Sequence, residues 1–153
     1  MPGFLEMTVD KFTFRAATDR LYSPEGLWVF WLQPQGQNRV RIGFTDFLQQ
    51  HSGDATFVTV KPVGTKLKAG EEFAELETIK VALALDSPVD GNVVAVNAAL
   101  ELTPELVNQD PYEKGWLAEI EATNWEADRA KLLEPHAYFT VMQSQAKEEL
   151  RKP

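Results

Sequence analysis

The 153-residue sequence contains no cysteine. It therefore has no disulfide framework, no thiolate nucleophile and no cysteine-based zinc site. Its two histidines, His51 and His136, lie far apart and form no helical His-x-x-x-His pair, so the sequence predicts no metal site. Any redox or metal chemistry must come from a group that is added to the chain.

Positive charge is also scarce. Fifteen Lys and Arg residues are outnumbered by 23 Asp and Glu residues, and the formal net charge is -8. Because phosphate binding needs a concentration of Lys and Arg, this balance argues against duplex DNA or RNA as the main ligand. No segment approaches the roughly 18 apolar residues of a membrane span, and the first residues resemble neither a signal peptide nor a transit peptide. We expect a cytoplasmic protein that binds neither nucleic acid nor membranes.

Motifs for catalysis by side chains alone are missing as well. The sequence has no glycine-rich phosphate loop ending in Gly-Lys-Ser/Thr and no Gly-x-Ser-x-Gly nucleophile elbow. Its carboxylates are numerous, but no pair has a spacing that singles it out as a general acid and base. The sequence therefore predicts no catalytic residue, and we expect a protein that is not itself an enzyme.

What the sequence does contain is a series of short β-prone segments separated by turn residues. Strands are predicted in five segments: Leu27 to Thr45 as a hairpin around a Gln-Pro-Gln-Gly-Gln-Asn loop, Ala55 to Val60, Glu72 to Leu85 as a second hairpin, Asn92 to Val96, and Gly115 to Ala122. The pair Asp90-Gly91 predicts a tight turn of the hairpin type. Short strands at close spacing indicate a mainly β sandwich or barrel.

Helices are predicted between and after these strands. Thr45 can cap a helix of one or two turns that ends at Gly53, and Thr103 can cap one short helix that starts at Pro104. Asn124 can cap the first of the helices that follow the last strand.

Length and composition indicate one domain that forms a core without a partner. Its predicted parts are a single domain over residues 1–153, an N-terminal extension over 1–21 and C-terminal helices over 123–153. Tyr138, Val141 and Met142 lie on one face of the last helix. Such a stripe is more often core than interface, so we expect a monomer.

One lysine, Lys80, lies at the turn of the longest β-prone hairpin. Most lysines in β proteins are solvated residues of an edge or a turn. An amine at an exposed hairpin tip is also accessible to a ligase, and once acylated it can carry a reactive group between distant active sites. Composition alone leaves both interpretations open.

An ordered series of motifs surrounds this lysine. Glu77-Thr78-Ile79-Lys80 is followed by Ser87-Pro88-Val89-Asp90-Gly91, then by Thr103-Pro104-Glu105-Leu106-Val107 and by Gly115-Trp116-Leu117. From about Tyr22 to the C-terminal helices, the chain resembles the lipoyl-carrying H-protein of the glycine cleavage system. The resemblance implies a hybrid barrel-sandwich of two antiparallel sheets, of the lipoyl and biotinyl carrier type. It also implies lipoic acid joined by an amide bond to Lys80.

The resemblance implies roles for the residues near Lys80. Glu77 matches the acidic position that attachment enzymes of this family recognise, although a solvated strand residue is the simpler interpretation. Gly70, Asp90 and Gly91 match turns that present the lysine. Biotin carriers share the general fold but place their lysine between two methionines, so Ile79 and Val81 favour lipoate.

The implied partners are a lipoate ligase or lipoyl transferase, glycine decarboxylase, aminomethyltransferase and dihydrolipoamide dehydrogenase. Three departures from the family pattern leave a second pathway open. Gly26 replaces the usual histidine before Trp28, the segment after Lys80 is unusually aliphatic, and an N-terminal extension precedes Tyr22. H-protein-like lipoate-binding proteins also serve a heterodisulfide-reductase-like complex of sulfur oxidation, where the arm carries sulfur-bound intermediates.

Overall fold

Two antiparallel sheets form the body of the protein, and the computed structural model describes residues 3–32 and 38–151. The predicted loop between Leu32 and Asn38 lies mostly outside these residues. The larger sheet has, in spatial order, the strands β3 (Leu21–Tyr22), β4 (Leu27–Trp31), β5 (Asn38–Phe44), β11 (Ala118–Ala122), β10 (Gly91–Val96) and β7 (Lys66–Leu67). The smaller sheet has the order β6 (Ala55–Val60), β8 (Glu72–Thr78) and β9 (Ala82–Asp86).

The two sheets enclose one apolar core. Ile42 and Ile120 of the larger sheet belong to the same buried cluster as Phe73 and Leu76 of the smaller one, and all four are fully buried. Each sheet thus covers the apolar face of the other, as the alternation of side chains along strands requires. The prediction of a mainly β fold with two antiparallel sheets is confirmed.

Short helices connect the strands. The helix α1 (Asp46–Ser52) begins and ends as predicted: the Thr45 hydroxyl accepts the Leu48 N–H at 3.2 Å, and Gly53 follows the helix with φ of 87°. The short helix predicted after Thr103 is present as α3 (Leu106–Gln109), but it starts two residues after Pro104. Thr103 does not cap it and instead ends α2 (Ala99–Leu102), where its N–H donates to the Ala99 carbonyl.

The C-terminal segment is helical, as predicted, with α4 (Trp125–Arg129) and α5 (Pro135–Arg151). Asn124 stands at the start of α4, but its side chain makes no capping bond. Of the predicted core stripe, Tyr138 and Met142 of α5 are fully buried, while Val141 is only half-buried. No helix within residues 3–32 and 38–151 is both long and apolar enough to cross a membrane.

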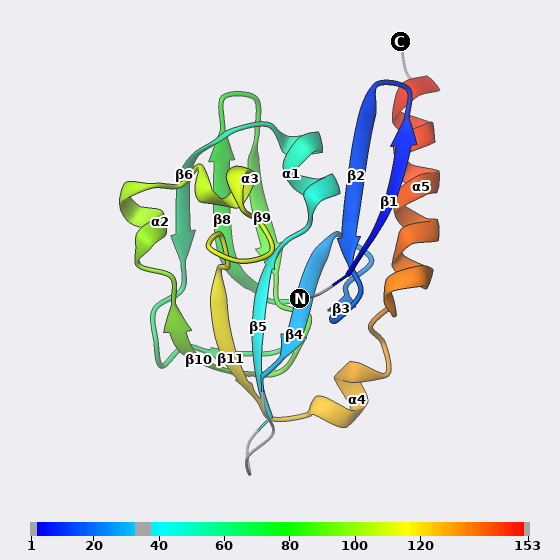
Figure 1. Ribbon diagram of the computed structural model, residues 1–153. Helices are drawn as coiled ribbons and strands as arrows, with labels where there is room; N and C mark the ends of the chain where they lie inside the picture. The colour runs from blue at the N-terminus through cyan, green and yellow to red at the C-terminus, as the bar shows by residue number, and fades with distance from the viewer. Residues whose placement is uncertain (1–2, 33–37, 152–153) are drawn as a thin grey trace.

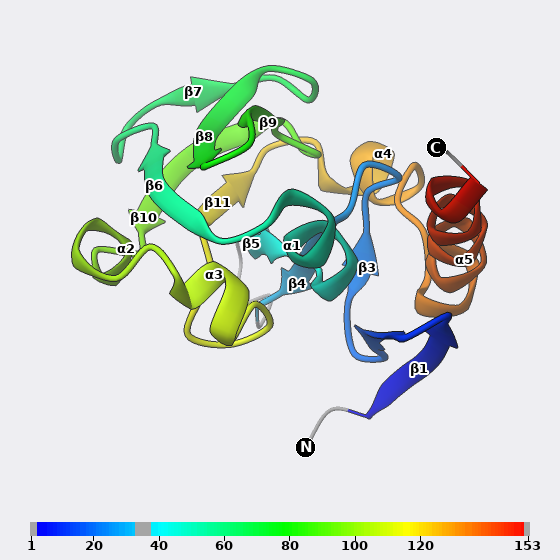
Figure 2. The same ribbon diagram turned by 90° about the horizontal axis from the view of Figure 1, so that it is seen from above.

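The N-terminal extension forms a hairpin of its own, to which the sequence motifs assign no structure. Its strands β1 (Phe4–Val9) and β2 (Phe12–Ala17) form a separate two-stranded sheet that lies between α5 and α1 (Figures 1 and 2). Val9 and Phe14 point into a second apolar cluster with Phe47 of α1 and with Tyr138 and Met142 of α5. The hairpin therefore covers the apolar face of α5 that would otherwise meet water.

Buried tyrosines join this hairpin to the rest of the chain. The Tyr22 hydroxyl donates to the Ala17 carbonyl, and the Tyr112 hydroxyl donates to the Arg15 carbonyl at 2.8 Å. Tyr138 stacks on Tyr22 with ring centroids 4.4 Å apart. Burial raises the pKa of Tyr22 and the pKa of Tyr112 well above their ordinary value, and it raises the pKa of Tyr138 to about 12.

Candidate functional site

Lys80 lies at the tip of the hairpin formed by β8 and β9. The two strands pair from Glu72 opposite Asp86 to Glu77 opposite Ala82, and the tip projects at one end of the molecule (Figure 1). The Lys80 side chain is exposed, and none of the ion pairs among the described residues involves it. The predicted exposed amine at a hairpin tip is present.

The Thr78 side chain organises this tip. Its hydroxyl accepts the backbone N–H groups of Lys80, at 3.2 Å, and of Val81, at 3.1 Å. The Thr78 N–H in turn donates to the Val81 carbonyl at 2.8 Å and closes the turn. The backbone that carries the lysine is thus held while its side chain stays free. Sequence reasoning assigned no role to Thr78, although a threonine before a turn is a recognised signal for such side-chain bonds.

Exposed apolar side chains flank Lys80 in the sequence and lie on the neighbouring edge strand. Ile79 is 90% exposed and Val81 is 44% exposed, and Phe57 of the edge strand β6 is 59% exposed. Glu77 is also exposed and lies on β8 between Phe57 and Ala82. A protein that binds the Lys80 end therefore meets an apolar surface with a carboxylate three residues from the amine.

The opposite end of the hairpin is held by hydrogen bonds from backbone N–H groups to a carbonyl and to two carboxylates. Gly70 adopts a φ of 95° and donates its N–H to the Ser87 carbonyl at 2.8 Å, in a turn that only glycine forms without strain. The Asp90 carboxylate accepts the Ala69 N–H at 2.7 Å, and the Asp90 N–H donates to the buried Asp128 carboxylate at 2.8 Å. These bonds join the base of the hairpin to α4.

The predicted hairpin turn at Asp90-Gly91 is wrong. The strands on either side of it, β9 and β10, belong to different sheets and do not pair. Gly91 is the first residue of β10, paired between Leu67 and Ala122, and its φ is not positive. A Cβ at this position would overlap the Glu121 carbonyl oxygen, so glycine is needed here for close strand approach.

Gly26, the position at which the resemblance implies a histidine, has a backbone that suits glycine. Its φ is 106°, and a Cβ built on it would lie 3.3 Å from Leu48 Cβ in α1. Its carbonyl accepts the N–H of Thr45, the residue that caps α1. Gly26 therefore takes part in the backbone arrangement that leads into α1.

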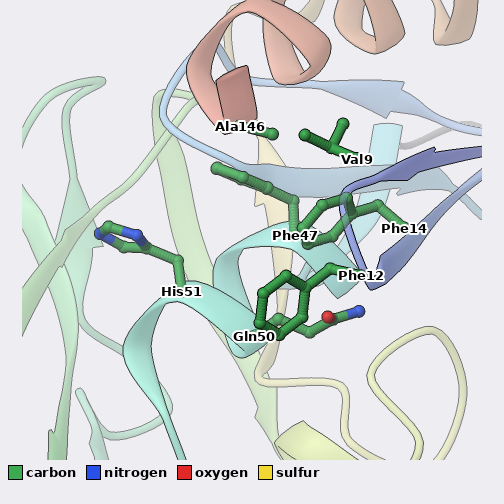
Figure 3. A pocket seen from close by; sticks show the side chains of 7 residues that line it. All are labelled: Val9, Phe12, Phe14, Phe47, Gln50, His51 and Ala146. Carbon is green, nitrogen blue, oxygen red and sulfur yellow. The ribbon is translucent and has the colours of Figure 1, made fainter. Parts of the chain in front are cut away.

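An apolar pocket of about 200 Å³ lies between the N-terminal hairpin and α1. Its lining residues are Val9, Phe12, Phe14, Phe47, Gln50, His51 and Ala146 (Figure 3). The His51 ring stacks on the Phe47 ring at 6.0 Å and points away from the phenylalanines of the hairpin. No group of three or more His, Asp or Glu side chains suited to a metal ion occurs among the described residues.

A family model described as glycine cleavage H-protein matches residues 20–145. The chain belongs to the glycine cleavage H-protein family. The matched region contains both sheets, the Lys80 hairpin and most of α5. The N-terminal hairpin lies outside it, so the hairpin is an addition to the H-protein fold in this chain.

Relatives within the family are similar over most of their length. The glycine cleavage system H protein of Mycolicibacterium vanbaalenii is 44% identical over 110 residues, which are 71% of this chain and 84% of that protein. That of Thermus thermophilus is 39% identical over 128 residues, 84% of this chain and 96% of that protein. The crystal structure of the H protein from Mycobacterium marinum superposes with a TM-score of 0.71 at 30% identity, covering 80% of this chain and 95% of that one.

These relatives decide between the two pathways that the sequence motifs left open. All three are named as glycine cleavage system H proteins. The glycine cleavage interpretation is therefore supported over the sulfur-oxidation interpretation.

Proposed function

We propose that this protein is the lipoyl carrier of a glycine cleavage system in the cytoplasm, with the lipoyl group attached to Lys80. The observation that carries the proposal is the exposed Lys80 amine on a tip that the Thr78 hydroxyl holds in place. An amide at this nitrogen needs no rearrangement of the hairpin, because the amine has no ion-pair partner among the described residues. The residues present therefore fit the group.

The side chains at the tip serve attachment and presentation. The Thr78 bonds restrict the backbone, so that movement is confined to the lysine side chain and whatever is joined to it. The exposed Glu77 carboxylate supplies a charge that an attachment enzyme, a lipoate ligase or a lipoyl transferase, can recognise beside the amine. A lipoyl group bound there would supply a dithiolane for electron and aminomethyl transfer, chemistry that a cysteine-free chain lacks.

Tethering gives the carrier its advantage. A reactive group at the end of a long flexible arm is held at high effective concentration in the active site of any enzyme that binds the hairpin end. The proposed enzymes are glycine decarboxylase, aminomethyltransferase and dihydrolipoamide dehydrogenase. The carrier acts as their shared cosubstrate and contributes no catalytic residue of its own.

Intact-mass measurement after lipoylation tests the attachment site. The wild-type protein should gain the mass of one lipoyl group, and Lys80→Arg should gain none. Lys68→Arg is the matched control, because it removes another exposed lysine and should leave the gain unchanged. A wild-type protein that stays unmodified beside a competent ligase, or a modified Lys80→Arg variant, would refute the proposal.

Reconstitution tests the pathway. Lipoylated protein added to purified glycine decarboxylase should support exchange of bicarbonate with the glycine carboxyl group. If the lipoylated protein supports no exchange while an authentic H-protein does, the glycine role is rejected even though Lys80 carries the arm.

A further inference from the structure

The turn that carries Lys80 is built without the usual turn residues. The Thr78 N–H donates to the Val81 carbonyl and closes a hairpin loop of two residues, Ile79 and Lys80. Two-residue hairpin loops usually adopt turns with a positive φ at the first loop residue, where Asn and Gly are favoured and a β-branched side chain is strongly disfavoured. Neither Ile79 nor Lys80 has a positive φ. This loop is therefore a different kind of turn.

The Thr78 hydroxyl makes this turn possible. In many β-turns the carbonyl of the first residue accepts the N–H of the fourth residue. Here the hydroxyl of the first residue accepts the N–H groups of both Lys80 and Val81. The loop backbone is thus hydrogen-bonded without a positive φ, so a branched apolar residue, Ile79, occupies the first loop position without strain.

The Ile79 side chain is left almost entirely in water. It is 90% exposed, against 44% for Val81 and 59% for Phe57. A single exposed apolar residue needs no explanation, but this one is accompanied by Val81 and by Phe57, which pairs with Glu77 on the neighbouring strand. Because folding buries so little of Ile79, a partner that covers this side chain gains nearly all of its burial free energy.

Reach identifies the partner. An enzyme that joins a lipoyl group to Lys80 must bring its active site to the end of the lysine side chain. The Cα of Ile79 lies only about 3.8 Å from the Cα of Lys80, because the two residues are consecutive. Enzymes that act on the dithiolane meet it at the far end of the completed arm, further from Ile79. The attachment enzyme is therefore the partner whose surface comes closest to this side chain.

We propose that Ile79 is a specificity-determining residue for lipoyl attachment, bound in an apolar pocket of the enzyme that modifies Lys80. Thr78 is the positioning residue that fixes the turn and so keeps Ile79 exposed beside the amine. Glu77 supplies a charge at the same end of the hairpin, and Ile79 supplies the apolar anchor of the contact. The inference rests on the proposed function, since it concerns how the same lysine is recognised.

Steady-state lipoylation by a lipoate ligase, with this protein as the varied substrate, tests the anchor. Ile79→Ser should raise KM about tenfold with kcat unchanged, because the contact is lost while the amine is still presented. Ile79→Val stays apolar and should keep a KM close to that of the wild type. Leu102→Ser is the matched control, since Leu102 is 91% exposed and lies in α2, away from the hairpin tip (Figure 1). Equal KM values for Ile79→Ser and Leu102→Ser would overturn the proposal.

Variants of Thr78 test the positioning role. Thr78→Val keeps the shape of the side chain and removes the hydroxyl, so it should speed amide hydrogen exchange of Lys80 and Val81 and lower kcat/KM for lipoylation about tenfold. Thr78→Ser keeps the hydroxyl and should restore both values. Thr59→Val makes the same substitution at an exposed threonine of β6 and should change neither. Wild-type lipoylation kinetics in Thr78→Val would refute the positioning role.

Two further readouts separate the anchor from other causes. Amide exchange of Lys80 and Val81 in Ile79→Ser should match the wild type; faster exchange would assign the higher KM to a disordered turn and overturn the anchor. A doubled mass in solution that Ile79→Ser abolishes would assign the side chain to a contact between two copies, with the same consequence. If the wild type gains a lipoyl group and Ile79→Ser behaves like the control, the anchor fails while the proposed function stands. If the wild type gains none, the proposed function itself fails.

Discussion

Raising the pH above 10 should unfold this protein steeply, because all of its three tyrosines are buried. Each hydroxyl donates a hydrogen bond inside the protein, Tyr22 to Ala17, Tyr112 to Arg15 and Tyr138 to the Thr45 hydroxyl at 3.0 Å. Desolvation is the largest cause that raises the pKa of each phenol in the folded state. The folded protein therefore retains three protons that the unfolded chain releases.

The sign and the size of the effect follow from linkage. An unfolded tyrosine has a pKa of about 10, so the stabilisation is fully present below pH 10 and is lost as the pH rises towards the folded pKa values. Each retained proton lowers the free energy of unfolding by about 1.4 kcal/mol per pH unit in this window, and three lower it by about 4 kcal/mol per unit. By pH 12 the loss reaches about 8 kcal/mol, which is comparable with the total stability of a typical domain.

Spectrophotometric titration of phenolate absorbance, compared with near-ultraviolet circular dichroism at each pH, checks this expectation. Phenolate should remain absent through pH 10 and should then form together with the loss of tertiary structure. Tyr138→Phe keeps the ring stack and removes one ionisable group, so it should reduce the dependence of the unfolding free energy on pH by about one third. Phenolate that forms near pH 10 while the fold persists would refute the reasoning.

Three further predictions concern stability, each measured as the free energy of unfolding in urea. Gly26→His should lose about 2 kcal/mol because of the φ of 106°, with Gly26→Ala losing a similar amount; a neutral result would show that the loop relaxes freely. Gly91→Ala should lose about 3 kcal/mol, since its Cβ would overlap the Glu121 carbonyl, and an unchanged stability would contradict the close strand approach. Phe14→Ala should lose about 3 kcal/mol and Phe12→Ala less than about 1 kcal/mol, because Phe14 is buried and Phe12 is exposed; equal losses would argue against a packed N-terminal hairpin.

Local signals account for the elements that were predicted well. Thr45 and Gly53 mark the ends of α1 because capping and left-handed φ are decided within a few residues. The Lys80 hairpin follows from two β-prone runs that are adjacent in the sequence, and the ordered motifs around it indicated the H-protein family before any contact was known. The exposed amine, the central feature of the candidate site, could therefore be read from the sequence.

Contacts between distant segments decided the rest. Gly91 has the sequence of a hairpin turn, but its pairing with β7 and β11 places it inside a strand, and no local pattern encodes those partners. The N-terminal hairpin becomes ordered because α5, more than a hundred residues later, offers an apolar face for it to cover. The sequence by itself determined the chemistry, because it places the Lys80 amine at the turn of a hairpin and contains no cysteine. Only the tertiary structure decided which strands and turns hold the hairpin that carries that amine, since burial and strand pairing depend on which distant segments meet.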